Sequence, residues 1–136
     1  MLELILCVDD DPITLMLCKM VISKSTFAEE IITAQNGEEA LSYFDDLKLN
    51  YLGTEILKYP KLILLDLNMP VMGGWEFLDH FAKEEYRSAF KDAKVIVLSS
   101  TIDPEDIKKA KTYPMVMDFL SKPISKEILE DLKKAM

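Results

Sequence analysis

Short apolar runs separated by longer amphipathic stretches constrain this chain more than any other feature. The runs Leu2–Val8, Leu62–Leu65 and Val95–Leu98 are apolar at almost every position. Such runs are typical of strands that are covered on both faces, as in parallel sheets. Two further runs, Glu30–Ala34 and Asp118–Leu120, also lie between helical stretches. The order predicts an α/β fold, a doubly wound five-stranded parallel sheet in a three-layer αβα arrangement with five helices.

The starts of the helices carry local signals. Asp11 before Pro12, and Asp103 before Pro104, each place an N-cap side chain ahead of a proline in the first turn. The first helix is expected over Pro12–Ser25, and Ser125 is expected to begin the last. A second helix begins near Gly37 and is expected to end at Gly53. Its predicted apolar face is Ala40, Leu41, Phe44, Leu47 and Tyr51.

Length and charge exclude several classes of protein. The 136 residues suit one domain, expected over residues 1–136 with no output domain. The net charge of −8 argues against a nucleic-acid partner, which would need a basic surface. No apolar run approaches the length of a membrane span, so we expect a cytoplasmic protein with no membrane contact. Cys7 and Cys18 have apolar neighbours and are expected to be small buried hydrophobic residues.

Polar side chains follow the predicted strands where each one ends. Asp9 and Asp10 follow the first strand, and Asp66 follows the third. Ser99 and Lys122 follow the fourth and fifth strands. Ligands of parallel sheets collect beyond the carboxyl ends of the strands, so these groups are expected to meet at one edge.

Clustered carboxylates limit the chemistry of this edge. Two carboxylates roughly 5 Å apart repel by about 3 kcal/mol at an effective dielectric near 20. The cluster therefore needs a cation or must take up protons. Oxygen ligands favour Mg²⁺, which binds through one or two carboxylates together with phosphate oxygens. Aspartate is a known nucleophile that forms an aspartyl-phosphate, and Lys122 would add a second positive charge.

Four motifs together resemble the receiver domains of two-component response regulators, including the single-domain chemotaxis type. They are Val8-Asp9-Asp10, Leu65-Asp66-Leu67-Asn68-Met69-Pro70, Val97-Leu98-Ser99 and Lys122-Pro123. The resemblance covers residues 2–135 and implies a flavodoxin-like (βα)5 fold. It also implies a phosphohistidine donor, on a histidine kinase or a histidine phosphotransfer protein of a phosphorelay, and a downstream protein target.

The resemblance implies a role for each matched position. Asp66 would be the phosphoryl acceptor, and Lys122 would contact the phosphate. Mg²⁺ would be bound by Asp10, by Asp66 and by the backbone carbonyl of Asn68, with Asp9 acting through water. Ser99 would be the switch hydroxyl and Phe119 the switch aromatic residue. Pro123 occupies the place of a cis-proline in the family.

The first helix has more apolar residues than one buried face needs. The family's register would turn Thr14, Leu17, Cys18 and Val21 inward. Ile13, Met16 and Met20 then share another face, at helical spacing. An exposed apolar group with two methionines suits docking of the phosphodonor's helix. Burial against neighbouring elements is the alternative.

Three classes of function compete. The first is a signalling switch that accepts phosphate and is not an enzyme, apart from slow autodephosphorylation. The second is an aspartate-nucleophile phosphatase, which would usually carry an acid where this chain has Asn68. The third is a degenerate module that binds partners without phosphate. The intact set of Asp9, Asp10, Asp66, Ser99 and Lys122 favours the switch.

Overall fold

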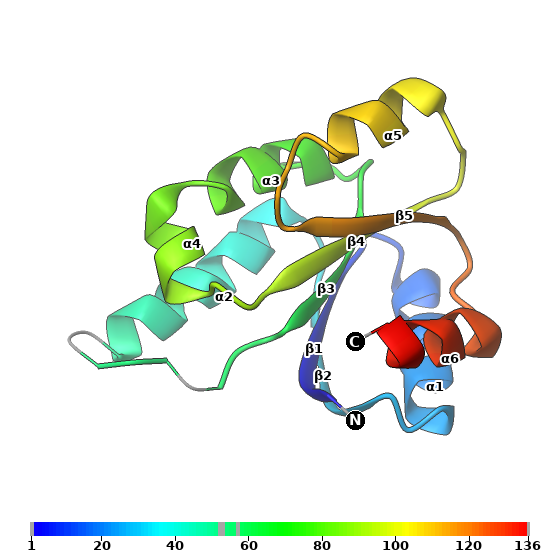
Figure 1. Cartoon of the computed structure of the whole chain (residues 1–136), viewed down its shortest axis with the longest axis horizontal. Coiled ribbons are helices and arrows are strands. Elements are labelled where there is room, and N and C mark those ends of the chain that lie inside the picture. Colours follow the sequence, from blue (N-terminus) through cyan, green and yellow to red (C-terminus); the bar gives the residue numbers. More distant parts are fainter. Residues whose placement is uncertain (1, 52–53, 57, 136) are drawn as a thin grey trace.

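The computed structural model describes residues 2–51, 54–56 and 58–135. These residues form five strands and six helices (Figure 1). The strands are β1 (Leu2–Val8), β2 (Ala28–Ala34), β3 (Leu62–Asp66), β4 (Lys94–Ser99) and β5 (Val116–Ser121). The helices are α1 (Pro12–Lys24), α2 (Gly37–Asn50), α3 (Gly74–Phe81), α4 (Glu84–Ala89), α5 (Pro104–Ala110) and α6 (Lys126–Ala135).

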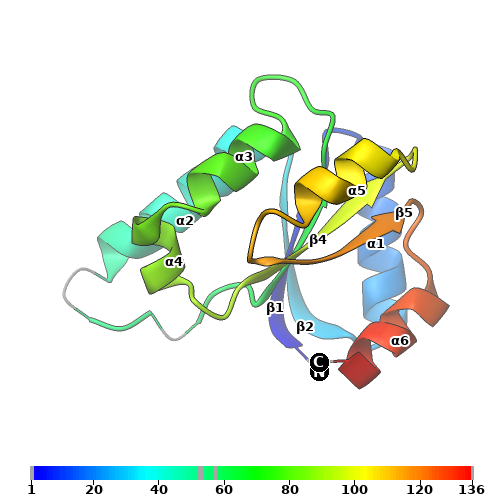
Figure 2. The same ribbon diagram turned by 45° about the horizontal axis from the view of Figure 1, so that its top comes forward.

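All five strands run parallel in one sheet, in the order β2-β1-β3-β4-β5. The chain steps from β1 to β2 in one direction and then proceeds through β3, β4 and β5 in the other. Right-handed crossovers place the helices of the two directions on opposite faces. Accordingly, α1 and α6 cover one face, while α2, α3 and α4 lie on the other (Figures 1 and 2). The expected doubly wound, flavodoxin-like fold is confirmed.

The central strands are buried on both faces, so each contributes to two hydrophobic cores. Successive side chains of a strand point to opposite faces. In β1, Leu6 and Val8 pack beneath α2 and α3, whereas Ile5 and Cys7 pack beneath α1 and α6. The core under α1 and α6 also receives Leu15, Cys18, Ile22, Leu129 and Leu132.

The expected helix caps are present. The Asp11 carboxylate accepts a hydrogen bond from the backbone of Ile13, and that of Asp103 accepts one from Glu105. Each cap satisfies a backbone donor that the helix itself leaves unpaired, which contributes about 1 kcal/mol. The start of α1 is thereby fixed directly after the acidic run that follows β1.

The expected number of helices is wrong by one. Two short helices, α3 and α4, occupy the connection between β3 and β4. The added helix α4 is tied to the long helix α2, because the Tyr86 hydroxyl donates a 2.6 Å hydrogen bond to Asp45. Tyr86 and Phe90 are also buried in the aromatic part of the core. Elsewhere, β2, β4 and β5 begin one or two residues earlier than expected.

The expected inward face of α1 is partly wrong: Cys18 is buried and Val21 packs partly against the core, whereas Leu17 is exposed. The expected residues were Thr14, Leu17, Cys18 and Val21, and the buried ones are Leu15, Cys18 and Ile22. At the start of the helix, the Thr14 hydroxyl donates a hydrogen bond to Asp11, the N-cap residue. In α2 the expected face is correct except for Tyr51, which is exposed and lies beyond the end of the helix. The predicted stop at Gly53 lies outside the described residues.

Candidate functional site

The order of the strands reverses between β1 and β3, and the candidate site lies at the carboxyl ends of these two strands. Such a reversal is where open parallel sheets bind their ligands. Val8 pairs with Leu65 in the register of the sheet, so Asp9 and Asp66 leave neighbouring strands at the same level. Ser99 ends β4, and Lys122 directly follows β5. The chain therefore brings all four strand ends named by the sequence to one edge.

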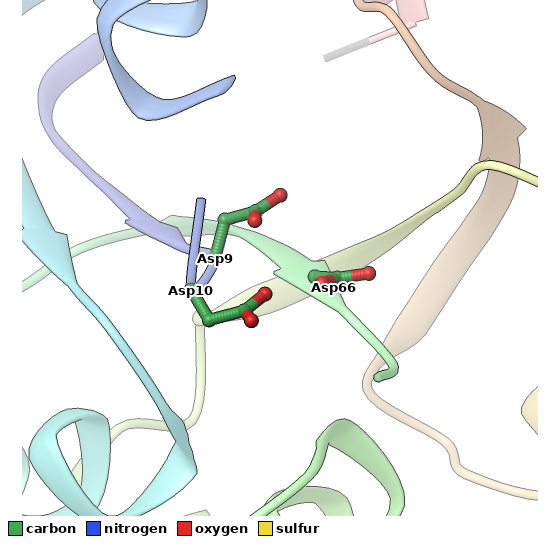
Figure 3. A group of neighbouring side chains, drawn as sticks. All are labelled: Asp9, Asp10 and Asp66. Atoms are coloured by element: carbon green, nitrogen blue, oxygen red, sulfur yellow. The ribbon is translucent and has the colours of Figure 1, made fainter. Parts of the chain in front are cut away.

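Three aspartates form the acidic part of the site (Figure 3). One carboxylate oxygen from each of Asp9, Asp10 and Asp66 lies within 4.8 Å of the other two. Asp9 and Asp66 are only 5% and 7% exposed, while Asp10 is exposed. The cluster thus has two desolvated carboxylates and one that faces solvent, all with oxygen ligands suited to a hard cation.

Lys122 provides the positive charge of the site. Its ammonium nitrogen lies 2.7 Å from an oxygen of Asp9 and 3.3 Å from an oxygen of Asp66. The lysine side chain is 19% exposed, so both pairs are largely screened from bulk water. One ammonium therefore bridges the two buried carboxylates.

The pKa of the Asp66 carboxyl lies above its ordinary value. Burial is the main cause, and the neighbouring charge of Asp9 adds to it. Lys122 and a backbone hydrogen bond from Asn68 act in the opposite direction. For Lys122, burial lowers the pKa, but the hydrogen bond and charges of Asp9 and Asp66 outweigh it and leave a raised pKa. The lysine is therefore charged at neutral pH, whereas the negative charge of Asp66 is only partly balanced by its surroundings.

Asp9 is held in place by the turn that leads into α1. One oxygen of its carboxylate accepts a 2.9 Å hydrogen bond from the backbone of Asp11, and the other pairs with Lys122. Asp11 in turn caps α1, as described above. The three consecutive aspartates thus differ in function: Asp11 is structural, and Asp9 and Asp10 face the site.

Ser99 ends β4, the strand next to β3, and Phe119 lies in β5. Ser99 is buried, and its hydroxyl donates a 2.7 Å hydrogen bond to the carbonyl of Thr101. Phe119 is partly buried against the core on the α2 and α3 side of the sheet. The peptide bond between Lys122 and Pro123 is cis, as the family resemblance implied.

Comparison with known proteins decides the family. The sequence model of the response regulator receiver domain matches residues 5–134. The chain belongs to the receiver domain family. Receiver domains are signalling domains rather than enzymes that turn over a substrate.

Several relatives resemble this receiver over nearly its whole length. A probable methanogenesis regulatory protein, FilR2 of Methanothrix harundinacea, is 31% identical over 98% of this chain and 78% of its own. The chemotaxis protein CheY of Listeria monocytogenes is 31% identical over 96% of both chains. A two-component response regulator from Cytophaga hutchinsonii is 30% identical and superposes with a TM-score of 0.84 over 98% of this chain and 96% of its own. Other curated relatives are longer, and this receiver spans less than half of their length.

A search of the described part of this receiver for helices long and apolar enough to cross a bilayer finds none.

The outer face of α1 is apolar and exposed. Ile13, Met16 and Met20 are 62%, 54% and 45% exposed, so the alternative of burial does not hold for them. Leu17, which was expected to be buried, is 46% exposed and extends the same face. We call Ile13, Met16, Leu17 and Met20 the α1 face.

One feature of the site was not foreseen from the sequence. Gly74, the first residue of α3, lies so close to Asp66 that an added Cβ would stand 2.5 Å from the Asp66 carbonyl oxygen. A signal for this close approach exists in the glycine that follows the acceptor motif. On the other side of the sheet, Cys7 and Cys18 are buried in the core, as expected.

Proposed function

We propose that Asp66 of this receiver accepts a phosphoryl group from a phosphohistidine on a histidine kinase or a histidine phosphotransfer protein. The observation that carries the proposal is the position of its carboxylate, which ends a central strand beside two acids and an ammonium group. Asp9 is engaged by the backbone of Asp11 and by Lys122. Asp10 is exposed, which leaves Asp66 as the buried nucleophile.

The proposed transfer is a displacement at phosphorus. An oxygen of Asp66 forms a bond to phosphorus while the bond from phosphorus to the donor's imidazole nitrogen breaks, and the imidazole leaves with that electron pair. Lys122 balances the negative charge of the phosphoryl oxygens. Ser99 donates its hydrogen bond to a phosphoryl oxygen in place of the Thr101 carbonyl.

Mg²⁺ fits the donor set of the site. The ligands would be the carboxylates of Asp10 and Asp66 and the backbone carbonyl of Asn68, with Asp9 acting through a water molecule. The fit is supported by three carboxylates whose oxygens lie close together and by the raised pKa of Asp66. When bound, the ion supplies charge compensation for the acids and for the phosphoryl oxygens.

Phosphorylation would act as a switch on partner binding. Movement of the Ser99 hydroxyl would free space that Phe119 fills, and this shift in population would be sensed by a downstream protein. We propose that this receiver acts in the cytoplasm and that it loses its phosphate slowly by itself.

Incubation with acetyl phosphate and Mg²⁺ is expected to add the mass of one phosphoryl group to the intact chain. Asp66→Asn is expected to abolish the gain because the amide cannot act as the nucleophile, and EDTA is expected to abolish it in the wild type. Asp131→Asn, which changes an exposed acid of α6, is the matched control and should behave as wild type. Intact mass over time also measures the slow loss of phosphate. Uptake that persists in Asp66→Asn would refute the assignment, and no uptake from acetyl phosphate or from a phosphohistidine donor would favour the phosphate-independent module.

We further propose that the α1 face binds the helix that carries the donor's phosphohistidine. The face begins at Ile13, two residues after the Asp11 cap, so a helix seated on it lies next to Asp9 and Asp10. Two of its residues, Met16 and Met20, have flexible side chains that adapt to an apolar partner. Exposed apolar residues grouped in this way are typical of binding surfaces.

Met16→Glu together with Met20→Glu is expected to slow phosphotransfer from a protein donor by at least about tenfold, because a charge in an apolar contact costs more than 1.4 kcal/mol. The donor in this assay is a histidine kinase that phosphorylates the wild-type chain. Uptake from acetyl phosphate is the internal control and should not change, since this small donor does not need the face. Equal slowing with both donors would instead indicate damage to the site, and unchanged transfer from the kinase would exclude the α1 face as the docking surface.

A further inference from the structure

Three side-chain contacts join α3 to the end of α5 and to the segment between α5 and β5. The ring of Tyr113, which follows α5, stacks on the ring of Trp75 in α3, with 6.1 Å between the ring centroids. The Tyr113 hydroxyl donates a 2.5 Å hydrogen bond to Asp79, one turn further along α3. The ammonium nitrogen of Lys109 in α5 lies 4.5 Å from the centroid of the Trp75 ring. We call Trp75, Asp79, Lys109 and Tyr113 the α3–α5 clamp.

These contacts have a large share in holding α5, which lies beside α3 (Figures 1 and 2). Of the seven residues of α5, all of them described, Ala110 alone is buried. The helix precedes β5, which is an edge strand of the sheet. A short helix with so little buried surface gains little from hydrophobic packing or from its own hydrogen bonds. Its position therefore depends on the contacts at its two ends.

The start of α5 is connected to the phosphoacceptor site. The buried Ser99 hydroxyl donates a 2.7 Å hydrogen bond to the carbonyl of Thr101. Thr101 lies in the loop that leads to Asp103, the N-cap residue of α5. When Ser99 donates to a phosphoryl oxygen instead, this loop loses that hydrogen bond. The helix is thus held from one end by Ser99 and from the other by the α3–α5 clamp.

We propose that the α3–α5 clamp restrains the phosphorylation switch: it holds α5 in the position described here, and phosphorylation of Asp66 opens it. This inference rests on the proposed function of Asp66 and adds the residues that set how readily the switch responds. Phe119, the proposed switch aromatic residue, packs against the same core as Trp75 and Tyr113. Contacts that exist in only one of two conformations favour that conformation, so weakening the clamp raises the population of the other.

The Tyr113 hydroxyl is the part of the clamp that one substitution removes most cleanly. Burial is the main cause that raises the pKa of Tyr113 to about 12, and the hydrogen bond and charge of Asp79 add to it. The hydroxyl is therefore a donor at neutral pH, and its acceptor is a carboxylate, which strengthens the hydrogen bond. Tyr113→Phe removes this hydrogen bond but keeps the ring that stacks on Trp75, and the exposed Asp79 returns to water.

Amide hydrogen exchange tests the restraint in the absence of phosphate. In Tyr113→Phe, the peptides that cover α5 should exchange about fivefold faster than in wild type, which corresponds to about 1 kcal/mol for the lost hydrogen bond. Tyr86→Phe is the matched control, since it removes a tyrosine hydrogen bond to Asp45 between α4 and α2. It should leave exchange in α5 unchanged. Wild-type exchange of α5 in Tyr113→Phe, or the same acceleration in Tyr86→Phe, would overturn the proposal.

Uptake from acetyl phosphate tests the link to Asp66. Tyr113→Phe should take up the phosphoryl group faster than wild type, by up to about fivefold, because α5 is already released in a larger fraction of the molecules. Tyr86→Phe should react at the wild-type rate. Equal or slower uptake by Tyr113→Phe would overturn the role of the clamp in the switch. A wild type without any uptake is a different result, which would refute the proposed function itself.

Trp75 is the single tryptophan of the chain and reports on the clamp directly. Phosphorylation of the wild type is expected to shift its fluorescence emission to longer wavelength, because the ring loses its contact with Tyr113 and becomes more exposed to water. Asp66→Asn treated in the same way should show no shift. Wild-type protein that is phosphorylated by intact mass, but whose Trp75 emission stays at the original wavelength, would show that the clamp does not open and would overturn the proposal.

Discussion

Lys122→Met is expected to lower the free energy of unfolding by about 3 kcal/mol at neutral pH without divalent cations. The methionine replaces most of the apolar stem of the lysine but not its charge. Asp9 and Asp66 are then left as buried carboxylates without the ammonium that bridges them at 2.7 and 3.3 Å. Breaking a buried pair by removing one partner is costly because the remaining charges stay desolvated.

The loss of stability in Lys122→Met should become smaller as the pH falls. Burial and Asp9 already raise the pKa of Asp66, and Lys122 is one of the influences that lower it. Without the lysine, the folded-state pKa of Asp66 rises further above its unfolded value. An acid whose pKa is higher in the folded state than in the unfolded state favours folding at pH values below its unfolded-state pKa. This contribution to stability is lost as the pH rises through the folded-state pKa. The difference between variant and wild type should therefore shrink on acidification from neutral pH towards about pH 4.

Urea unfolding followed by circular dichroism measures both effects. Mg²⁺ should stabilise Lys122→Met more than it stabilises wild type, because the ion then takes over the compensation that the ammonium provided. Lys108→Met is the matched control. Lys108 is exposed on α5 and has no ion pair within the described residues, so its change should lie within about 0.5 kcal/mol. A loss that is the same at both pH values and with or without Mg²⁺ would show that the lysine acts by packing rather than by charge.

The composition of the site could be predicted from the sequence because its position follows from a rule about parallel sheets. Asp9, Asp66, Ser99 and Lys122 each stand at the end of a strand or directly after it, and the carboxyl ends of parallel strands share one edge. Only the assignment of the runs to strands was needed. The roles of these residues in phosphoryl transfer stay predictions until the chemistry is measured.

The rotation of α1 could not be predicted for an equally physical reason. Apolar residues surround this helix on nearly every side, so hydrophobic periodicity does not single out a buried face. The observed rotation buries Leu15 and Ile22 and exposes Leu17. The same rotation places Cys18 in the core that also contains Cys7. The rotation is not encoded in a local pattern.

The additional helix α4 was missed because its stability comes from tertiary contacts. Six residues are too few to form a stable helix by themselves. Tyr86 anchors α4 through burial and through its hydrogen bond to Asp45, a residue of the long helix α2. The long helix α2 therefore supports the added helix.

Gly74→Ala is expected to lower the free energy of unfolding by about 2 kcal/mol and to slow phosphoryl uptake at Asp66. The added methyl group would stand 2.5 Å from the Asp66 carbonyl oxygen and 2.9 Å from the Cα of Leu67. Both are backbone atoms of the segment that carries the acceptor, so the segment or the start of α3 must move. Alanine suits a helix better than glycine by roughly 1 kcal/mol, which offsets only part of a cost of up to about 3 kcal/mol.

Gly37→Ala at the start of α2 is the matched control for this substitution. Its methyl group would meet Met72 Cγ at 2.8 Å and Sδ at 3.0 Å, and Phe77 Cβ at 3.0 Å. The Met72 side chain is flexible and can turn away, and none of these atoms belongs to the backbone that carries the acceptor, so the loss should stay clearly below that of Gly74→Ala. Urea unfolding and the rate of uptake from acetyl phosphate should both separate the two variants. If Gly37→Ala slowed uptake as much as Gly74→Ala, the effect would be general loosening of the helices; a selective effect would show that the bare backbone of Gly74 holds the acceptor strand in place.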